Sequence, residues 1–326
     1  MQGNVAVNLF PCGGGSPNLR FPWEGRTGEG TIPRIPSLGA DIRIRSVDHR
    51  EDVVEGIGSV GRRYAVRHPG ASDRVVVAGG VRIGGAAPPV WMAGPCAVES
   101  FEQLDRVGAV LQSLGIPVLR GGAFKPRTSP YAFQGLGEAG LRILREVGRK
   151  YGLAVVTEVL ATRDLPRVCE AADILQIGAR NMFNTDLLRA AGESGKPILL
   201  KRGMMATIEE FLFAAEYACL GGAREIILCE RGIRTFETAT RNTLDIAAVP
   251  ILKKETPFPV VVDVSHALGR TDILAPIIQA VLAAGANGVM LEVHPDPGSA
   301  RSDAAQQLPL EALSPLYQET KIPERH

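Results

Sequence analysis

From Pro88 onward, short apolar runs rich in β-branched residues alternate with longer runs in which apolar residues recur every three or four positions. The short runs predict strands, and the longer runs predict amphipathic helices. Strands are expected at residues 90–95, 117–121, 154–159, 174–179, 197–202, 225–230, 259–264 and 288–293. Helices are expected at residues 101–114, 137–151, 163–171, 184–194, 207–220, 240–248, 272–284 and 309–317. Eight strands that alternate with eight helices predict an α/β fold of the (β/α)8 TIM barrel type.

A doubly wound parallel sheet is the alternative α/β architecture. Such a sheet often binds a dinucleotide through a GxGxxG turn after its first strand, and no such turn follows residues 90–95. Eight units also suit a closed barrel better than an open sheet, so the barrel is the preferred prediction.

The segments on either side of the repeat have a different character. Residues 1–62 are rich in Gly and Pro and are expected to form a partly disordered N-terminal extension. Residues 63–87 contain two short apolar runs joined at Gly79-Gly80, which predicts a β-hairpin leading into the barrel. The barrel itself is expected over residues 88–318, followed by a C-terminal tail over residues 319–326.

Composition excludes several functional classes. The formal net charge is +1, so no broad basic surface is expected, and neither nucleic acid nor a membrane surface is an expected partner. The most apolar stretch, 273–293, contains Gln279 and Asn287 and suits a buried helix followed by a strand better than a membrane span. The five Cys form no CxxC pair, and the N-terminus lacks a secretory pattern. A cytoplasmic protein without structural disulfides is therefore expected.

Polar residues gather where the predicted strands end. In a TIM barrel the carboxyl ends of the strands form the face that carries the active site. Reading these ends in order gives Cys96, Arg120 with Lys125, Glu158, Arg180, Lys201 with Arg202, Glu230 with Arg231, Asp263 with His266, and Glu292 with His294. A purely structural face would not place a titratable group at nearly every strand end, so this face predicts a functional site.

Five cations in this set are expected to converge on one barrel mouth: Arg120, Lys125, Arg180, Lys201 and Arg231. Like charges repel, so such a group is costly unless a polyanion fills it. A phosphorylated carboxylate, or two phosphorylated substrates, would match this charge. Around Lys125, the Gly121-Gly122 pair permits close approach of the backbone, and Pro126 stiffens the segment that presents Arg127 and Thr128.

A second subset has the chemistry of a metal site. Cys96, His266, Glu292 and Asp303 offer a thiolate, an imidazole and two carboxylates. This donor set suits a borderline divalent ion such as Mn, Fe, Co or Zn, and suits Mg poorly. A buried core thiol is the alternative interpretation of Cys96.

Several of these stretches, in the same order, resemble the 3-deoxy-D-arabino-heptulosonate 7-phosphate (DAHP) synthases of the type I beta branch. The similarity extends from about Arg62 to Leu316. The matching stretches are Ala93-Gly-Pro-Cys-Ala-Val-Glu-Ser100, Arg120-Gly-Gly-Ala-Phe-Lys-Pro-Arg-Thr-Ser-Pro130, Gln176-Ile-Gly-Ala-Arg-Asn181, Leu200-Lys-Arg-Gly-Met204, Glu230-Arg-Gly-Ile-Arg-Thr235, Asp263-Val-Ser-His266 and Glu292-Val-His-Pro295. The resemblance implies condensation of phosphoenolpyruvate with erythrose 4-phosphate, the entry step of the shikimate pathway.

The resemblance also assigns roles to residues. It implies that Cys96, His266, Glu292 and Asp303 bind the metal. We expect Lys125, Cys96 and His266 to form the catalytic set, with the hypothesis that Lys125 donates a proton. The implied substrate-binding set comprises Arg120, Lys125, Pro126, Arg127, Thr128, Glu158, Ala179, Arg180, Lys201, Arg231 and Asp263. A homo-oligomer, dimer or tetramer, is expected.

Three departures from the family pattern are visible. Val264 stands where Pro is usual, and Ala304-Ala305 replaces an expected Gly-containing turn. Residues 1–62 also lack the β-α-β-β-α-β pattern of a ferredoxin-like regulatory module, so weak or absent feedback inhibition by aromatic amino acids is expected.

Three rival functions are open. A 3-deoxy-octulosonate phosphate synthase would use arabinose 5-phosphate, but carries Lys-Ala-Asn-Arg-Ser where this chain has Lys125-Pro-Arg-Thr128. A Schiff-base aldolase would use Lys201. A non-catalytic barrel that binds a phosphorylated metabolite would be expected to have lost a metal ligand or Lys125, and neither is lost.

Overall fold

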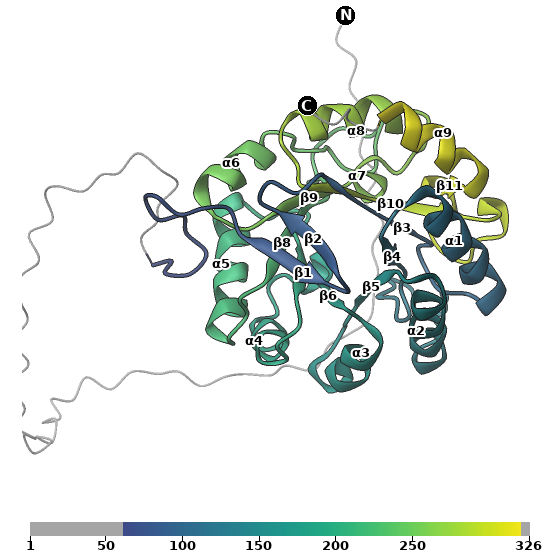
Figure 1. Cartoon of the computed structure of the whole chain (residues 1–326), viewed down its shortest axis with the longest axis horizontal. Coiled ribbons are helices and arrows are strands. Elements are labelled where there is room, and N and C mark those ends of the chain that lie inside the picture. The colour runs from purple at the N-terminus through teal and green to yellow at the C-terminus, as the bar shows by residue number, and fades with distance from the viewer. Residues whose placement is uncertain (1–60, 321–326) are drawn as a thin grey trace, which may run out of the picture. The chain divides into compact units, whose positions relative to one another are not determined.

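Eight parallel strands close into a barrel in the computed structural model, which describes residues 61–320 (Figure 1). The barrel strands are β3 (Val90–Gly94), β4 (Val118–Arg120), β5 (Ala154–Glu158), β6 (Ile174–Ile177), β7 (Ile198–Lys201), β8 (Ile226–Glu230), β9 (Val260–Asp263) and β10 (Gly288–His294). Closure is direct, because β10 pairs in parallel with both β9 and β3. The predicted (β/α)8 barrel is therefore confirmed.

Helices surround this barrel in Figure 1. They are α1 (Phe101–Leu114), α2 (Glu138–Tyr151), α3 (Leu165–Ala171), α4 (Thr185–Glu193), α5 (Ile208–Leu220), α6 (Ala248–Glu255), the short α7 (Val264–Leu268), α8 (Leu274–Ala283) and α9 (Leu310–Thr320). Local sequence fixes several ends. Ser100 caps α1 by accepting a hydrogen bond from the Gln103 amide, and Gly115 ends the helix in the left-handed region at φ 68°.

The helix predicted at 240–248 is wrong. The structure begins α6 at Ala248 and leaves the preceding segment irregular, with a bridge between Ile233 and Thr243. Pro250 explains the shift, because proline has no amide hydrogen and is tolerated only in the first turn of a helix. The long loop between β8 and α6 thus reaches over the carboxyl ends of the strands.

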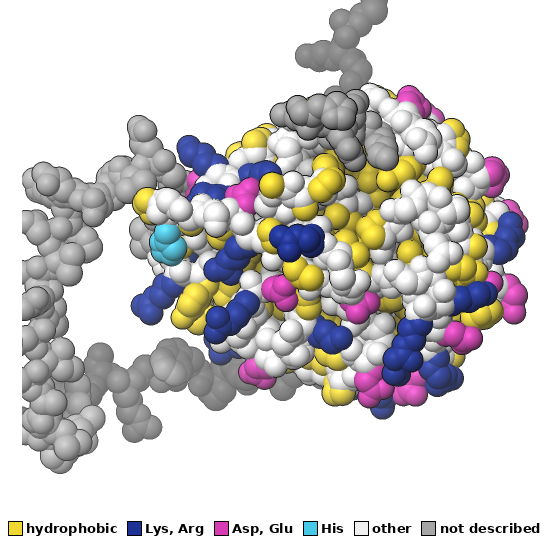
Figure 2. Space-filling model, in the orientation of Figure 1, with side chains coloured by type: hydrophobic (Ala, Val, Ile, Leu, Met, Phe, Trp, Pro, Cys, Tyr) yellow, Lys and Arg dark blue, Asp and Glu magenta, His cyan; other side chains and the backbone are white. Residues whose placement is uncertain are grey.

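A two-stranded hairpin lies at the opposite end of the barrel. β1 (Val75–Ala78) and β2 (Val81–Gly84) pair antiparallel, and Val76 and Ile83 are buried against inward-facing strand residues such as Met92. In Figure 2, which views the molecule from the same side as Figure 1, the described residues of this face form a continuous surface. The hairpin covers this end, so a ligand must reach the barrel interior from the carboxyl ends of the strands.

Some predictions fall on residues outside 61–320. The partly disordered extension, the absence of a regulatory module and most of the C-terminal tail belong to this group, and they stay predictions. Among the described residues, none of the helices has the length and apolar character needed to cross a membrane.

Candidate active site

A cavity of about 350 Å³ opens at the carboxyl ends of the barrel strands, within the size range of small-molecule sites. It is lined by every residue of the expected substrate-binding set except Asp263, namely Arg120, Lys125, Pro126, Arg127, Thr128, Glu158, Ala179, Arg180, Lys201 and Arg231. His266 and Asp303 also line it. Asp263 is fully buried beneath the cavity and contacts both Lys201 and His266.

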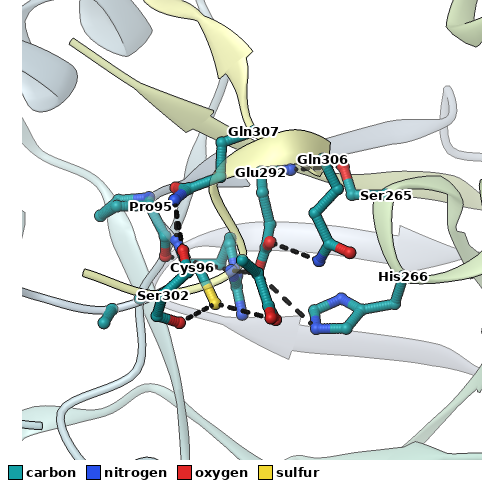
Figure 3. A network of polar contacts seen from close by, with 12 residues as sticks. Pro95, Cys96, Ser265, His266, Glu292, Ser302, Gln306 and Gln307 are labelled. Carbon is teal, nitrogen blue, oxygen red and sulfur yellow. Dashed lines mark hydrogen bonds and ion pairs between the residues drawn. The ribbon is translucent and has the colours of Figure 1, made fainter. Parts of the chain in front are cut away.

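Three of the four expected metal ligands lie together. The Cys96 Sγ atom and one carboxylate oxygen each from Glu292 and Asp303 all lie within 4.8 Å of one another. His266 is adjacent rather than part of this tight group, with its Nε2 atom 3.7 Å from the Glu292 Oε1 atom (Figure 3). A thiol, two carboxylates and a nearby imidazole form a donor set that fits a borderline divalent transition ion.

Two glutamines hold this cluster in place, as Figure 3 shows. The Cys96 amide donates to the Gln307 side-chain oxygen at 2.9 Å, and the Gln306 side-chain amide donates to Glu292 Oε2 at 2.7 Å. Ser302 lies 2.8 Å from the Cys96 Sγ atom through its hydroxyl oxygen. The loop after β10 therefore contacts both Cys96 and Glu292.

Asp263 orients the imidazole of His266. It caps α7 by accepting a hydrogen bond from the His266 amide at 3.0 Å, and its other oxygen lies 2.8 Å from His266 Nδ1. When Nδ1 donates to this carboxylate, Nε2 presents a lone pair toward Glu292, which is the arrangement that metal-binding histidines commonly have. Val264 occupies the first position of α7, where either Val or the family's usual Pro can stand.

The turn at Asp303 also departs from the expected pattern. Asp303 adopts a left-handed conformation at φ 48°, the single positive φ of a non-glycine residue in the part of the chain that the structure describes. Asp tolerates this region better than most residues. Asp303 thus makes the turn itself, ahead of Ala304-Ala305, and directs its carboxylate toward Cys96, with one oxygen 3.4 Å from Sγ.

Each acidic member of the cluster has a cationic neighbour. Arg120 contacts Glu292 at 2.5 Å, Lys125 Nζ lies 3.0 Å from Cys96 Sγ, and Arg241 contacts Asp303 at 3.2 Å. Burial alone would raise the pKa of Glu292, but the charges of His266, Arg120 and Lys125 lower it to about 2. Burial, reinforced by the Glu292 charge, raises the pKa of the Cys96 thiol to about 12. The thiol is therefore protonated at neutral pH in the metal-free cluster.

These shifts predict how stability depends on pH. The pKa of Glu292 falls from 4.5 to about 2 and that of Asp303 from 3.8 to about 2, where the Arg241 charge outweighs the effect of burial. Carboxylates with lowered pKa values stabilise the fold fully above about pH 4.5, and this contribution disappears as the pH falls through about 2. We expect the urea midpoint of the metal-free protein to fall across this window. The midpoint should fall less steeply with pH in Glu292→Gln. In the control Glu138→Gln, which replaces an exposed carboxylate on α2, it should fall as in the unmodified protein. If the midpoint fell equally steeply in all three proteins, the assignment to Glu292 would be contradicted.

Arg231 is a buried cation that lacks a counter-ion. Its side chain is 4 % exposed, and no carboxylate of the described residues lies within ion-pair distance. Burial, with the nearby Arg241 charge, lowers the pKa of its guanidinium. Lys201, in contrast, forms a close ion pair with Asp263. An anionic ligand would relieve the cost of the unpaired Arg231 charge.

Comparison with known proteins identifies the family. Residues 65–322 match the model of the DAHP synthetase I family. The chain belongs to this family. It is 54% identical over 274 residues to the phospho-2-dehydro-3-deoxyheptonate aldolase of Thermotoga maritima, which covers 83% of this chain and 80% of that protein. A 2-dehydro-3-deoxyphosphooctonate aldolase of Magnetococcus marinus is 32% identical, with 78% of this chain and 94% of that protein covered.

Solved structures agree with this family assignment. The crystal structure of the Thermotoga maritima DAHP synthase matches with a TM-score of 0.77 at 54% identity, covering 80% of this chain and 76% of that one. A truncated form of the Thermotoga enzyme matches with a TM-score of 0.73 at 51% identity, covering 79% of this chain and 94% of that one.

In this member of the DAHP synthetase I family, Arg202 and Glu230 were expected at strand ends but neither lines the cavity. Arg202 instead contacts Glu230 at 2.9 Å and Asp245 at 2.8 Å, and Glu230 accepts a hydrogen bond from the Gly232 amide at 2.6 Å. This buried network joins the ends of β7 and β8. It thereby fixes the backbone next to Lys201 and Arg231, the cavity cations that adjoin Arg202 and Glu230 in the sequence.

Breaking this network should be costly. Arg202→Met would leave Glu230 buried without its cation, a change that typically destabilises a fold by about 3–5 kcal/mol. Urea unfolding should report this loss directly. The matched control is Arg167→Met, which removes an exposed ion pair with Glu138 (N–O distance 2.7 Å) and should cost at most about 1 kcal/mol. Equal losses in the two variants would mean that the network contributes no more than a surface pair.

The residues that sequence reasoning missed include four that contact Cys96, Glu292 or Asp303. Arg241 lines the cavity and contacts Asp303, while Ser302, Gln306 and Gln307 contact members of the Cys96 cluster. The wrong helix at 240–248 concealed Arg241, because a helix in that position would not have delivered a side chain to the cavity. Gln306 and Gln307 are uncharged and lie near Asp303 in a loop, and no spacing pattern in the sequence indicated that they belong to the site.

Proposed function

We propose that the chain is a metal-dependent DAHP synthase, which condenses phosphoenolpyruvate with erythrose 4-phosphate and water to give DAHP and inorganic phosphate. One observation carries this proposal: a cavity lined by cations ends at a cluster of one thiol and two carboxylates. The 54% identity to the Thermotoga maritima aldolase supports the substrate pair. The reaction would place the protein at the first step of the shikimate pathway.

The cation-lined wall suits phosphoenolpyruvate, which carries a phosphate and a carboxylate. Arg120, Arg180, Lys201 and Arg231 are proposed to bind these two groups. The unpaired, buried Arg231 supports this role most directly. Lys125, Pro126, Arg127 and Thr128 are proposed to hold erythrose 4-phosphate. Glu158 and Ala179 are proposed to complete the cavity wall, and Asp263 to support it from beneath. Bound in this way, the two reactants would be held in reacting geometry, which lowers the entropic part of the barrier.

The chemistry requires an electrophilic aldehyde and a stabilised leaving phosphate. Carbon 3 of phosphoenolpyruvate attacks the aldehyde carbon of the sugar, water adds at carbon 2, and the resulting hemiketal phosphate releases inorganic phosphate. A divalent ion held by Cys96, His266, Glu292 and Asp303 would act as a Lewis acid on the aldehyde or orient a water. Lys125 is proposed to donate a proton to the aldehyde oxygen as the new bond forms, and the arginines would offset the charge of the leaving phosphate.

Three alternatives have weaker support. The 2-dehydro-3-deoxyphosphooctonate aldolase of Magnetococcus marinus is 32% identical to this chain, against 54% for the heptonate enzyme of Thermotoga maritima. Lys201 is held in an ion pair with Asp263, whereas a Schiff base needs a free amine as its nucleophile. A non-catalytic metabolite-binding barrel would not need the thiol and carboxylate cluster.

Substrate preference tests the proposal. We expect phosphate release from phosphoenolpyruvate to require an aldose phosphate and to be fastest with erythrose 4-phosphate, because Lys125-Pro-Arg-Thr128 replaces the octulosonate-type segment. The measurement is a phosphate-release assay with a panel of four-, five- and six-carbon aldose phosphates. Faster turnover with arabinose 5-phosphate would reassign the substrate, and phosphate release without any sugar would indicate hydrolysis rather than condensation.

The expected dimer or tetramer and the expected cytoplasmic location stay predictions.

A further inference from the structure

An arginine stacks on an aromatic ring where two loops of the site meet. The Arg301 guanidinium carbon lies 3.6 Å from the centre of the Phe133 ring, whereas the other cation–π contacts of the described chain measure 5.0 to 5.8 Å. Phe133 belongs to the loop between β4 and α2 that carries Lys125–Thr128. Arg301 belongs to the loop after β10 that carries Asp303. The stack therefore joins the proposed sugar-phosphate segment to the proposed metal loop.

Glu99 fixes the other side of Arg301. The Arg301 amide donates to Glu99 Oε1 at 2.9 Å, and Glu99 Oε2 lies 3.7 Å from His294 Nε2. Glu99 follows Cys96 in the loop after β3, and His294 is the last residue of β10. One carboxylate thus ties together the loop that carries Cys96, the end of the strand that carries Glu292, and the loop that carries Asp303.

The His294 imidazole directs its Nε2 atom toward the Glu99 carboxylate. Its side chain is buried, and its Nδ1 atom accepts a hydrogen bond from the Asp296 amide at 3.0 Å. Acceptance at Nδ1 leaves the hydrogen on Nε2, which makes no hydrogen bond within residues 61–320. A buried donor without a hydrogen bond is costly, so the electrostatic contact with Glu99 is its compensation.

A second contact crosses the same pair of loops. Arg127 Nη1 donates to the Ser302 hydroxyl at 3.1 Å, and that hydroxyl lies 2.8 Å from Cys96 Sγ. Arg127 lines the cavity and Ser302 contacts Cys96, whereas neither Phe133 nor Arg301 lines the cavity. Two separate contacts thus hold the loops against each other.

We propose that Glu99, Phe133, His294 and Arg301 form a loop clamp, which positions the Cys96–Asp303 cluster and the Lys125–Thr128 segment as one unit. None of the four clamp residues lines the cavity, so they are positioning residues rather than catalytic ones. Because the clamp joins the two loops, binding of a divalent ion at the cluster and binding of the sugar phosphate strengthen each other. Linkage requires the coupling to be equal in both directions. The identities of the ligands rest on the proposed function.

Two variants weaken the clamp without touching the cavity. Arg301→Leu removes the stack on Phe133, and Glu99→Gln keeps an acceptor for the Arg301 amide but removes the charge that faces His294. Their matched controls are Arg189→Leu, which removes a cation–π contact with Tyr217 at 5.4 Å, and Glu225→Gln, whose carboxylate accepts the Val77 amide at the hairpin. Calorimetric titration of Mn²⁺ into metal-free protein measures the affinity for the divalent ion. The KM for erythrose 4-phosphate reports on binding of the sugar phosphate, and the KM for phosphoenolpyruvate serves as the internal comparison.

Both clamp variants should bind Mn²⁺ about tenfold more weakly, in the range typical of changes to residues that orient metal ligands. The KM for erythrose 4-phosphate should rise by about tenfold, while the KM for phosphoenolpyruvate changes by less than about twofold. Phe133→Leu combined with Arg301→Leu should add little beyond either single change, and Arg301→Lys should restore part of the loss. The controls should behave as the unmodified protein.

Equal rises in both KM values, or unchanged Mn²⁺ affinity with only a lowered melting temperature, would overturn the clamp and leave these contacts as ordinary fold stabilisation. Failure of the proposed function has a different signature. If another aldose phosphate proves to be the substrate, the same KM comparison is made with that sugar. If no sugar is turned over, the Mn²⁺ titrations of variants and controls decide alone, and an absence of Mn²⁺ binding to the unmodified protein would reject the clamp.

Discussion

Cys96→Ala should lose both its metal and its turnover while keeping its fold. The Cys96 Sγ atom is the selective donor of the cluster, because thiolates favour Mn, Fe, Co or Zn over Mg. Losing one protein ligand and the ion with it should lower kcat by at least about a thousandfold, or roughly 4 kcal/mol of transition-state stabilisation. Chelation of the unmodified enzyme should have the same effect, and a transition ion should restore turnover better than magnesium.

The fold should survive because the barrel core does not depend on this thiol. Cys229→Ala is the matched control: it shortens another buried cysteine, with a pKa raised to about 12 by burial, but one that packs in the barrel interior near the hairpin. This control should lose some stability and retain metal and activity. Emission spectroscopy, which measures metal content, and circular dichroism, which measures folding, distinguish the two variants. Full activity in metal-free Cys96→Ala would remove the ion from the mechanism.

The raised pKa of Cys96 gives this prediction a pH dependence. Burial holds the thiol protonated up to about pH 12 in the metal-free protein, so a binding ion must displace the proton. Metal affinity should therefore increase as the pH rises, by about tenfold per unit while one proton is released. Proton release on titration of the ion into weakly buffered protein measures this directly, and Cys96→Ala should release less.

Strand positions were predictable because parallel barrel strands are buried on both faces and read as continuous apolar runs. Where such a run stops, the chain emerges on one face of the barrel, so Arg120, Glu158 and Glu292 could be placed on a common face without any structure. Closure of the barrel then brings β10 beside β3, and hence Glu292 beside Cys96. The expected ligand cluster depended on this topology and not on spacing along the chain.

Loops were less predictable, because their course depends on contacts between distant segments. Arg202 directly follows β7 and Glu230 is the last residue of β8, positions like those of the cavity residues, yet the two side chains pair with each other. Direction at a strand end alternates from one residue to the next, and the sequence does not reveal which side chain turns inward. Arg241 lies in a loop held by the bridge between Ile233 and Thr243 and by a hydrogen bond from the Arg241 amide to the Leu268 carbonyl oxygen. These contacts join distant segments, so the contact of Arg241 with Asp303 could not be expected.

Lys125→Met should lower kcat by about a hundred- to ten-thousandfold, the range associated with loss of a general acid. Lys125 is 8 % exposed, and its Nζ atom lies 2.9 Å from the Cys96 carbonyl oxygen and 3.0 Å from Cys96 Sγ. No other lysine ammonium of the described residues contacts the cluster, so the proton that we propose for the aldehyde oxygen has one lysine source. Lys150→Met, which removes an exposed ion pair with Asp105, is the control and should leave kcat unchanged.

Lys125→Arg separates the two things that Lys125 supplies, a charge and a transferable proton. Arginine keeps the charge beside Cys96 and Glu292 but does not give up its proton at any ordinary pH. If Lys125 is the acid, Lys125→Arg should bind phosphoenolpyruvate with a KM near that of the unmodified enzyme and yet share the low kcat of Lys125→Met. The measurement is steady-state phosphate release for the three variants across pH. Recovery of kcat in Lys125→Arg would show that the charge alone is required, and the proton would then have to come from water.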